Sequence, residues 1–160
     1  MEQVTDIVKH AIANEVRAKT FYGKASELSS VGESQMVFIE LVEMEDQHAR
    51  RLVDAFGELL AEAGTDAEAY LREVQADLDR TLGEDAVRIL EDAAIRPVLD
   101  FAIGMEIQAR DNYLALAEKL SSEDLTALCQ ELADEEQKHH DSLMEARSGV
   151  DTPIDERPAL

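Results

Sequence analysis

Two copies of one pattern of acidic and imidazole side chains constrain this chain more than any other feature. Adding 91 to the three positions of the first copy gives the second: Glu15, Glu45 and His48, then Glu106, Glu136 and His139. Each of the six interrupts a stripe of apolar residues and tyrosine that recurs at alternating three- and four-residue steps, the spacing of helices that pack in a bundle. The stripes supply no lysine or arginine, so carboxylates buried along them would lack a compensating charge.

The same periodicity predicts an all-α chain with four long helices. They extend from about Val4 to Leu28, Ser34 to Glu62 and Pro97 to Leu120, and from the capping pair Ser121 and Ser122 to about Arg147. Two short turns and one long crossover are typical of a ferritin-like four-helix bundle made of two antiparallel hairpins. We therefore predict one bundle domain over residues 1–147 and a loose C-terminal tail over residues 148–160.

The crossover, residues 64–96, contains apolar residues at helical spacing and is expected to hold one or two short helices. The first group is Tyr70, Leu71, Val74 and Leu78, and the second is Val87, Ile89 and Leu90. The first long helix differs from the other three, because additional residues broaden its apolar arc: Ile7, Ile12, Val16 and Phe21.

The six polar residues are predicted to meet at one height in the bundle. Ser30, which with Glu33 resembles a capping box, lies fifteen residues after Glu15 and fifteen before Glu45. Ser121 stands in the same relation to Glu106 and Glu136. At 1.5 Å per residue, each pair of an antiparallel hairpin lies roughly 22 Å below its turn. Each histidine follows a glutamate by three residues and shares its helix face.

Four buried carboxylates balance the charge of two divalent ions, and neutral imidazoles complete the ligand shells. Oxygen-rich ligands with one imidazole per metal suit iron or manganese, zinc is possible, and redox chemistry requires iron or manganese. Tyr22 and Tyr113 each follow a stripe glutamate by seven residues. They are either aromatic packing residues or phenols that hydrogen-bond a ligand carboxylate.

The composition excludes several classes of partner. A formal net charge of −21 repels nucleic acid phosphates and anionic lipid headgroups. The single cysteine, Cys129, lies on an apolar stripe and is expected to be a buried thiol. No signal peptide or membrane span is recognisable, so the expected compartment is the cytoplasm. Asp46, Asp134 and Glu135 are assigned to the solvated face, and His140 is expected to point away from the six residues.

Four stretches of this chain resemble the rubrerythrin branch of the ferritin-like superfamily: NEVRAKTFY, EMEDQHARRL, GMEIQARDNY and DEEQKHHDSL. The resemblance implies a carboxylate-bridged di-iron centre that reacts with hydrogen peroxide or dioxygen. It further implies that Glu45 and Glu136 bridge the metals, that Glu15 and Glu106 are terminal ligands, and that each iron has one histidine.

The chain departs from rubrerythrins at two points. Ala109 stands where they carry an extra glutamate, which makes the ligand set closer to a bacterioferritin-type ferroxidase centre. No Cys-x-x-Cys pair is present, so an electron donor of the rubredoxin type would be a separate protein.

Three functions are compatible with the sequence besides a structural bundle with a vestigial site. The first is a di-iron oxidoreductase that reduces peroxide or dioxygen. The second is a ferroxidase with ferrous iron as substrate, and the third is an iron-storage or metal-binding protein with little turnover. By resemblance, the chain is expected to form a homodimer.

Overall fold

The computed structural model describes residues 3–28, 32–82 and 95–151, and the single positions 86, 88 and 90. Five helices span these segments: α1 (Val4–Leu28), α2 (Gly32–Glu62), α3 (Ala67–Arg80), α5 (Ile95–Ala117) and α6 (Glu123–Asp151). No strand occurs in these segments, which confirms the all-α prediction. None of the helices combines the length and the low charge that a membrane span requires.

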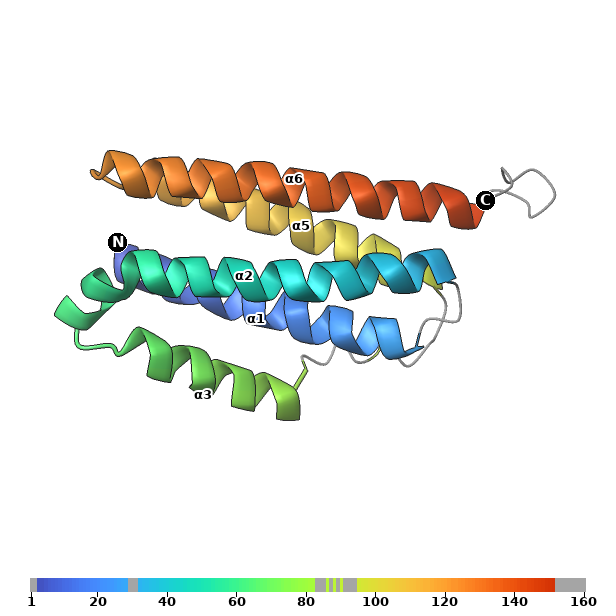
Figure 1. Ribbon diagram of the computed structural model, residues 1–160, viewed down its shortest axis with the longest axis horizontal. Coiled ribbons are helices and arrows are strands. Elements are labelled where there is room, and N and C mark those ends of the chain that lie inside the picture. The colour runs from blue at the N-terminus through green and yellow to red at the C-terminus, as the bar shows by residue number, and fades with distance from the viewer. Residues whose placement is uncertain are drawn as a thin grey trace.

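The four long helices form the predicted ferritin-like bundle (Figure 1). α1 packs against α2 and α5 packs against α6, so each hairpin is an antiparallel pair, and α1 also contacts α5 while α2 contacts α6. α3 runs back along the outside of the first hairpin and contacts both α1 and α2. The long crossover therefore returns the chain to the end of the bundle where α5 begins.

The helix ends differ from the predicted boundaries by a few residues. α5 begins at Ile95, so Pro97 lies in its first turn, where the missing N–H has no helical acceptor to lose. The Ser122 hydroxyl accepts a hydrogen bond from the Leu125 N–H at 3.4 Å, as expected of a cap. α6 continues through Asp151, so the first four residues of the expected tail are helical. Residues 152–160 and the expected Ser30–Glu33 capping box lie outside the described residues.

α3 explains the broad apolar arc of α1. Asp66 caps α3 by accepting a hydrogen bond from the Ala69 N–H at 2.9 Å, after Gly64 ends the preceding turn with a φ of +79°. Leu71, Val74 and Leu78 of α3 then form a cluster with Val16 of α1 and Ala49 of α2. A second short helix was predicted around Val87, Ile89 and Leu90. Leu90 is buried, and Val87 and Ile89 lie outside the described residues.

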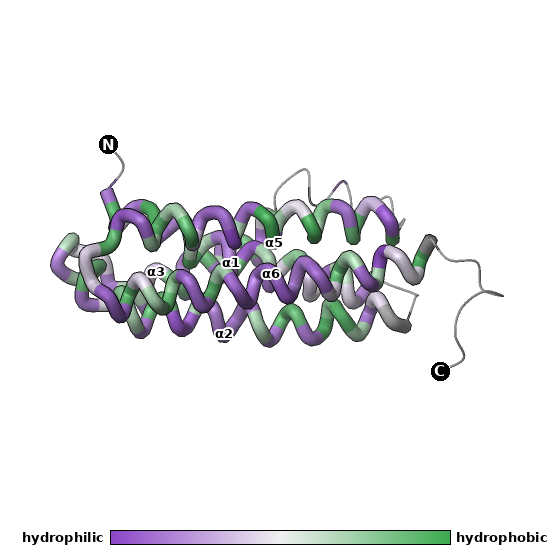
Figure 2. Tube along the Cα trace, turned by 90° about the horizontal axis from the view of Figure 1, so that it is seen from above, coloured by the Kyte–Doolittle hydropathy of each residue, from purple (hydrophilic) through white to green (hydrophobic). Residues whose placement is uncertain are grey.

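Besides the small cluster under α3, the core contains two large apolar clusters, one toward each end of the bundle. The first includes Val8, Leu52, Phe56, Leu116 and Leu132, and the second includes Phe21, Phe38, Leu41, Leu99 and Leu143. Hydrophobic and hydrophilic stretches alternate along the helices (Figure 2). The repeated polar residues lie between the two clusters in the sequence of each helix, so the apolar core closes them off at both ends.

Candidate metal centre

The structure brings all six repeated residues together inside the bundle. Their exposed fractions are between 0 and 5%: Glu15, Glu45, His48, Glu106, Glu136 and His139. One residue comes from α1, two from α2, one from α5 and two from α6. Ligand atoms of Glu45, His48, Glu136 and His139 all lie within 4.8 Å of one another, a separation that one or two metal ions can span.

The two histidines face the carboxylates through the same ring atom. His48 Nδ1 lies 3.0 Å from Glu136, 3.4 Å from Glu45 and 3.5 Å from Glu15. His139 Nδ1 lies 3.0 Å from Glu136, 3.1 Å from Glu45 and 3.4 Å from Glu106. Their rings are stacked with centroids 5.2 Å apart. Glu45 and Glu136 therefore contact both histidines, whereas Glu15 and Glu106 contact one each.

Several of these close atoms are not hydrogen-bonded to one another. Glu45 Oε1, Glu136 Oε2 and His139 Nδ1 are buried and make no hydrogen bond, although Nδ1 is within 3.1 Å of both oxygens. Lone pairs that converge on a common point, and not on a donor, have the arrangement of metal ligands. In the described part of the chain, the four carboxylates receive ion-pair contacts from the two histidines alone.

Burial and repulsion raise the pKa of two cluster carboxyl groups, whereas contacts with histidine lower the pKa of a third. Desolvation, followed by repulsion from Glu136, Glu106 and Glu15, raises the pKa of Glu45 well above its ordinary value. Desolvation likewise raises the pKa of Glu106 to about 8. For Glu136, contacts with His139 and His48 outweigh the opposing effect of burial and lower the pKa to about 2.

The same carboxylates raise the pKa values of the two imidazoles. Burial by itself lowers the pKa of each ring, but contacts with the surrounding carboxylates outweigh it. The pKa of His139 rises to about 12, and that of His48 also rises strongly. Without metal, protons therefore balance the carboxylate charge. Divalent cations in the same place would displace these protons, and the donor set of carboxylates plus imidazole fits iron or manganese.

Two tyrosines tie the hairpins together at the cluster. Tyr22 of α1 donates its hydroxyl hydrogen to Glu106 of α5, and Tyr113 of α5 donates to Glu15 of α1. Both phenols are almost completely buried, and desolvation raises both pKa values well above the ordinary value for tyrosine. Each neutral phenol therefore fixes the carboxylate of the opposite hairpin.

The family model for rubrerythrin matches residues 97–158, which include nearly all of α5 and the whole of α6. This second half of the chain is similar to rubrerythrin. No curated protein and no solved structure matches it significantly. The matched segment contains Glu106, Glu136 and His139, and the first hairpin, outside the match, supplies the other half of the cluster at the same offset.

One residue beside the cluster makes a contact that the sequence did not predict. Glu135, expected on the solvated face, lies 2.8 Å from His48 Nε2, and Arg51 Nη1 lies 2.8 Å from the same carboxylate oxygen. Helical spacing could not reveal this contact, because Glu135 and His48 belong to different hairpins. Asp134 is exposed as expected, and His140 contacts Gln137 and Asp141 and not the cluster.

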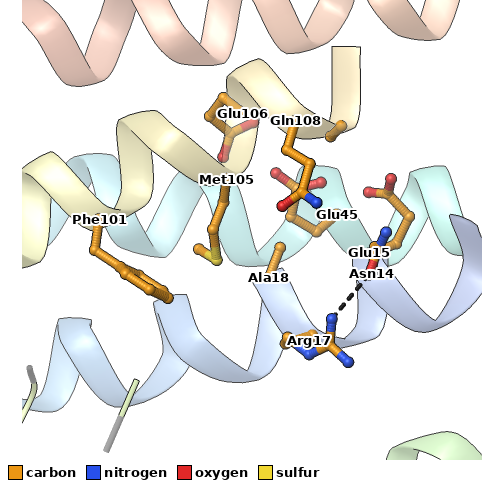
Figure 3. A pocket seen from close by; sticks show the side chains of 10 residues that line it. Asn14, Glu15, Arg17, Ala18, Glu45, Phe101, Met105, Glu106 and Gln108 are labelled. Atoms are coloured by element: carbon orange, nitrogen blue, oxygen red, sulfur yellow. Dashed lines mark hydrogen bonds between the residues drawn. The ribbon is translucent and has the colours of Figure 1, made fainter. Parts of the chain in front are cut away.

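A cavity of about 180 Å³ reaches the carboxylate side of the cluster between α1 and α5 (Figure 3). Glu15, Glu45 and Glu106 lie at its inner end, and Phe101 and Met105 form an apolar wall. The remaining lining is polar or small: Asn14, Arg17, Ala18, Gln108 and Ala109. Asn14 accepts a hydrogen bond from Arg17 at 2.9 Å. The cavity has room for several water-sized molecules, and Ala109 leaves free the space beside the carboxylates that a longer side chain would occupy.

Proposed function

We propose that this chain is a non-haem di-iron oxidoreductase that reduces hydrogen peroxide or dioxygen. The observation that carries the proposal is the buried set of four glutamates and two histidines, in which Glu45 Oε1, Glu136 Oε2 and His139 Nδ1 lie close together without a hydrogen-bond partner. The rubrerythrin match over the second hairpin supports iron as the metal. Manganese fits the same ligands, and zinc is also compatible with them.

The contacts of the histidines support separate roles for the glutamates. Glu45 and Glu136 each approach both imidazoles, as expected of carboxylates that bridge two ions. Glu15 approaches only His48 and Glu106 only His139, as expected of terminal ligands. Each ion would then have one terminal glutamate, one histidine and a share in two bridging carboxylates.

The cavity supports a small oxidant as the substrate. Reduction of hydrogen peroxide to two waters needs two electrons and two protons, and a ferrous pair held by this cluster can supply both electrons. Arg17 is the basic side chain on the cavity wall, and its positive charge partly offsets the attraction of the three cluster glutamates for a cation such as ferrous iron. Phe101 and Met105 limit the water in the cavity, while Tyr22 and Tyr113 keep the terminal carboxylates in position.

A ferroxidase is the second candidate, favoured by Ala109, which replaces the additional glutamate of rubrerythrins. In either case, the absence of a Cys-x-x-Cys pair from the sequence favours a separate electron-donor protein for any repeated reduction of the iron. A homodimer is proposed by resemblance alone.

Stopped-flow mixing of the ferrous protein with each oxidant tests the proposal. Faster oxidation by peroxide than by dioxygen supports a peroxidase, and fast oxidation by dioxygen with accumulation of ferric mineral supports the ferroxidase. His139→Ala should abolish the fast phase, and His140→Ala is the matched control because His140 is adjacent but contacts surface residues. Wild-type protein that binds no iron at these six residues would refute both candidates.

A further inference from the structure

The internal repeat makes the two halves of the cluster equivalent in their ligands but not in what supports the histidines. His48 and His139 present Nδ1 to the glutamates, which leaves Nε2 on the outer side of each ring. At His48, this nitrogen contacts the Glu135 carboxylate at 2.8 Å. No comparable contact to His139 Nε2 is found within residues 3–28, 32–82 and 95–151.

The repeat explains why, in the described part of the chain, a carboxylate contacts the outer nitrogen of His48 and none contacts that of His139. Subtracting the offset of 91 from Glu135 gives Met44, and adding it to Arg51 gives Ser142. A thioether cannot replace a carboxylate as an acceptor, and a hydroxymethyl group cannot reach as far as a guanidinium. Met44 and His139 line one surface cavity of about 280 Å³, so methionine occupies the region where a carboxylate would be needed.

Glu135 is also held in place. Arg51 contacts it at 2.8 Å and reaches Glu131 with its other terminal nitrogen at 3.1 Å. The Glu135 side chain is 29% exposed, so the contact with His48 is partly shielded from water. Glu135 of α6 therefore contacts both Arg51 and His48 of α2. The other ring nitrogen of His48, Nδ1, faces the cluster.

We propose that Glu135 is a positioning residue that makes the two metal positions unequal, with the position at His48 binding its ion more tightly. When a metal occupies Nδ1, the imidazole proton is on Nε2, where it donates to Glu135. A carboxylate acceptor fixes the ring orientation and makes the ligand nitrogen more basic, which commonly changes metal affinity 10–100-fold. Among the described residues no carboxylate contacts His139 Nε2 in this way, and the ion at His139 is expected to bind second and dissociate first.

This inference rests on the proposed metal centre, and titration of the metal-free protein with zinc distinguishes the two. Zinc is used because it reports ligand binding without turnover. Wild-type protein should bind two ions in unequal steps by calorimetry with chelator competition. In protein labelled with ¹⁵N-histidine, the His48 ring signals should shift before those of His139. Absence of binding would refute the metal centre, whereas two equal steps would overturn only the inequality.

Variants test the role of Glu135 itself. Glu135→Gln keeps the size of the side chain but removes its charge, and should weaken the tighter step about 10–100-fold while leaving the other within about twofold. Glu131→Gln is the matched control, because it removes the same charge beside Arg51 without touching His48, and it should preserve both steps. Met44→Glu should strengthen the weaker step. A Glu135→Gln protein with the wild-type ratio of affinities would overturn the proposal, provided that its circular dichroism shows a folded bundle.

Discussion

Removal of one phenol hydroxyl, in Tyr22→Phe or Tyr113→Phe, tests whether the tyrosines hold the ligand carboxylates. Each hydroxyl donates to a buried glutamate of the other hairpin, and phenylalanine retains the ring. A hydrogen bond to a charged group contributes about 1.5–3 kcal/mol. Because about 1.4 kcal/mol corresponds to a tenfold change, loss of this bond should weaken metal binding roughly 10–100-fold. In a chain of this size the same loss should lower the melting temperature by about 3–12 °C.

The assay combines chelator competition for Mn(II) with thermal unfolding followed by circular dichroism. Tyr70→Phe is the matched control, because its hydroxyl donates to the Lys9 carbonyl at 3.2 Å, outside the cluster. That variant should bind metal as the wild type does and lose about 0.5–1.5 kcal/mol of stability. Wild-type affinity in both cluster variants would refute the argument that the phenols orient the ligands. Equal losses of affinity in Tyr70→Phe would show that the effect is a general one on packing.

Three further results are expected. Glu45→Ala should lose bound metal and lower the melting temperature in metal-containing buffer, because metal binding is linked to folding, whereas Glu43→Ala on the exposed face should change neither. In metal-free protein, Glu106 has a raised pKa of about 8, so the folded state holds more protons than the unfolded state between about pH 4.5 and 8. Its stability should therefore fall as pH rises through that window. Metal binding strengthens over the same window, and the difference in melting temperature with and without Mn(II) should widen between about pH 5 and pH 8. Finally, a net charge of −21 destabilises the compact state by repulsion, so sodium chloride up to about 1 M should raise the melting temperature of the metal-free protein.

The composition of the helices made the bundle predictable. Apolar residues at helical spacing predicted the four long helices and α3, and the errors were confined to helix ends, such as the extension of α6 to Asp151. Caps and turns are local, but the last turn of a helix depends on what packs against it, and that information is not in the local sequence. The broad arc of α1 was visible in the sequence, although its cause, the packing of α3 against Val16, was not.

The repeat also made the composition of the cluster predictable, because a side chain that interrupts an apolar stripe has only the bundle interior to enter. Periodicity fixes the face of a helix on which a residue lies, and equal distances from the two turns fix its height. These two quantities are sufficient to bring six ligands to one place without knowledge of any contact.

Only the tertiary structure decided which residue meets which across the hairpins. Tyr22 and Glu106 are 84 residues apart, Tyr113 and Glu15 are 98 apart, and His48 and Glu135 are 87 apart. Each of these pairs depends on the relative rotation and spacing of two packed helices, and no local pattern encodes those quantities. The sequence by itself therefore determined an all-α bundle with a buried polar hexad, whereas packing determined how each hairpin holds the ligands of the other.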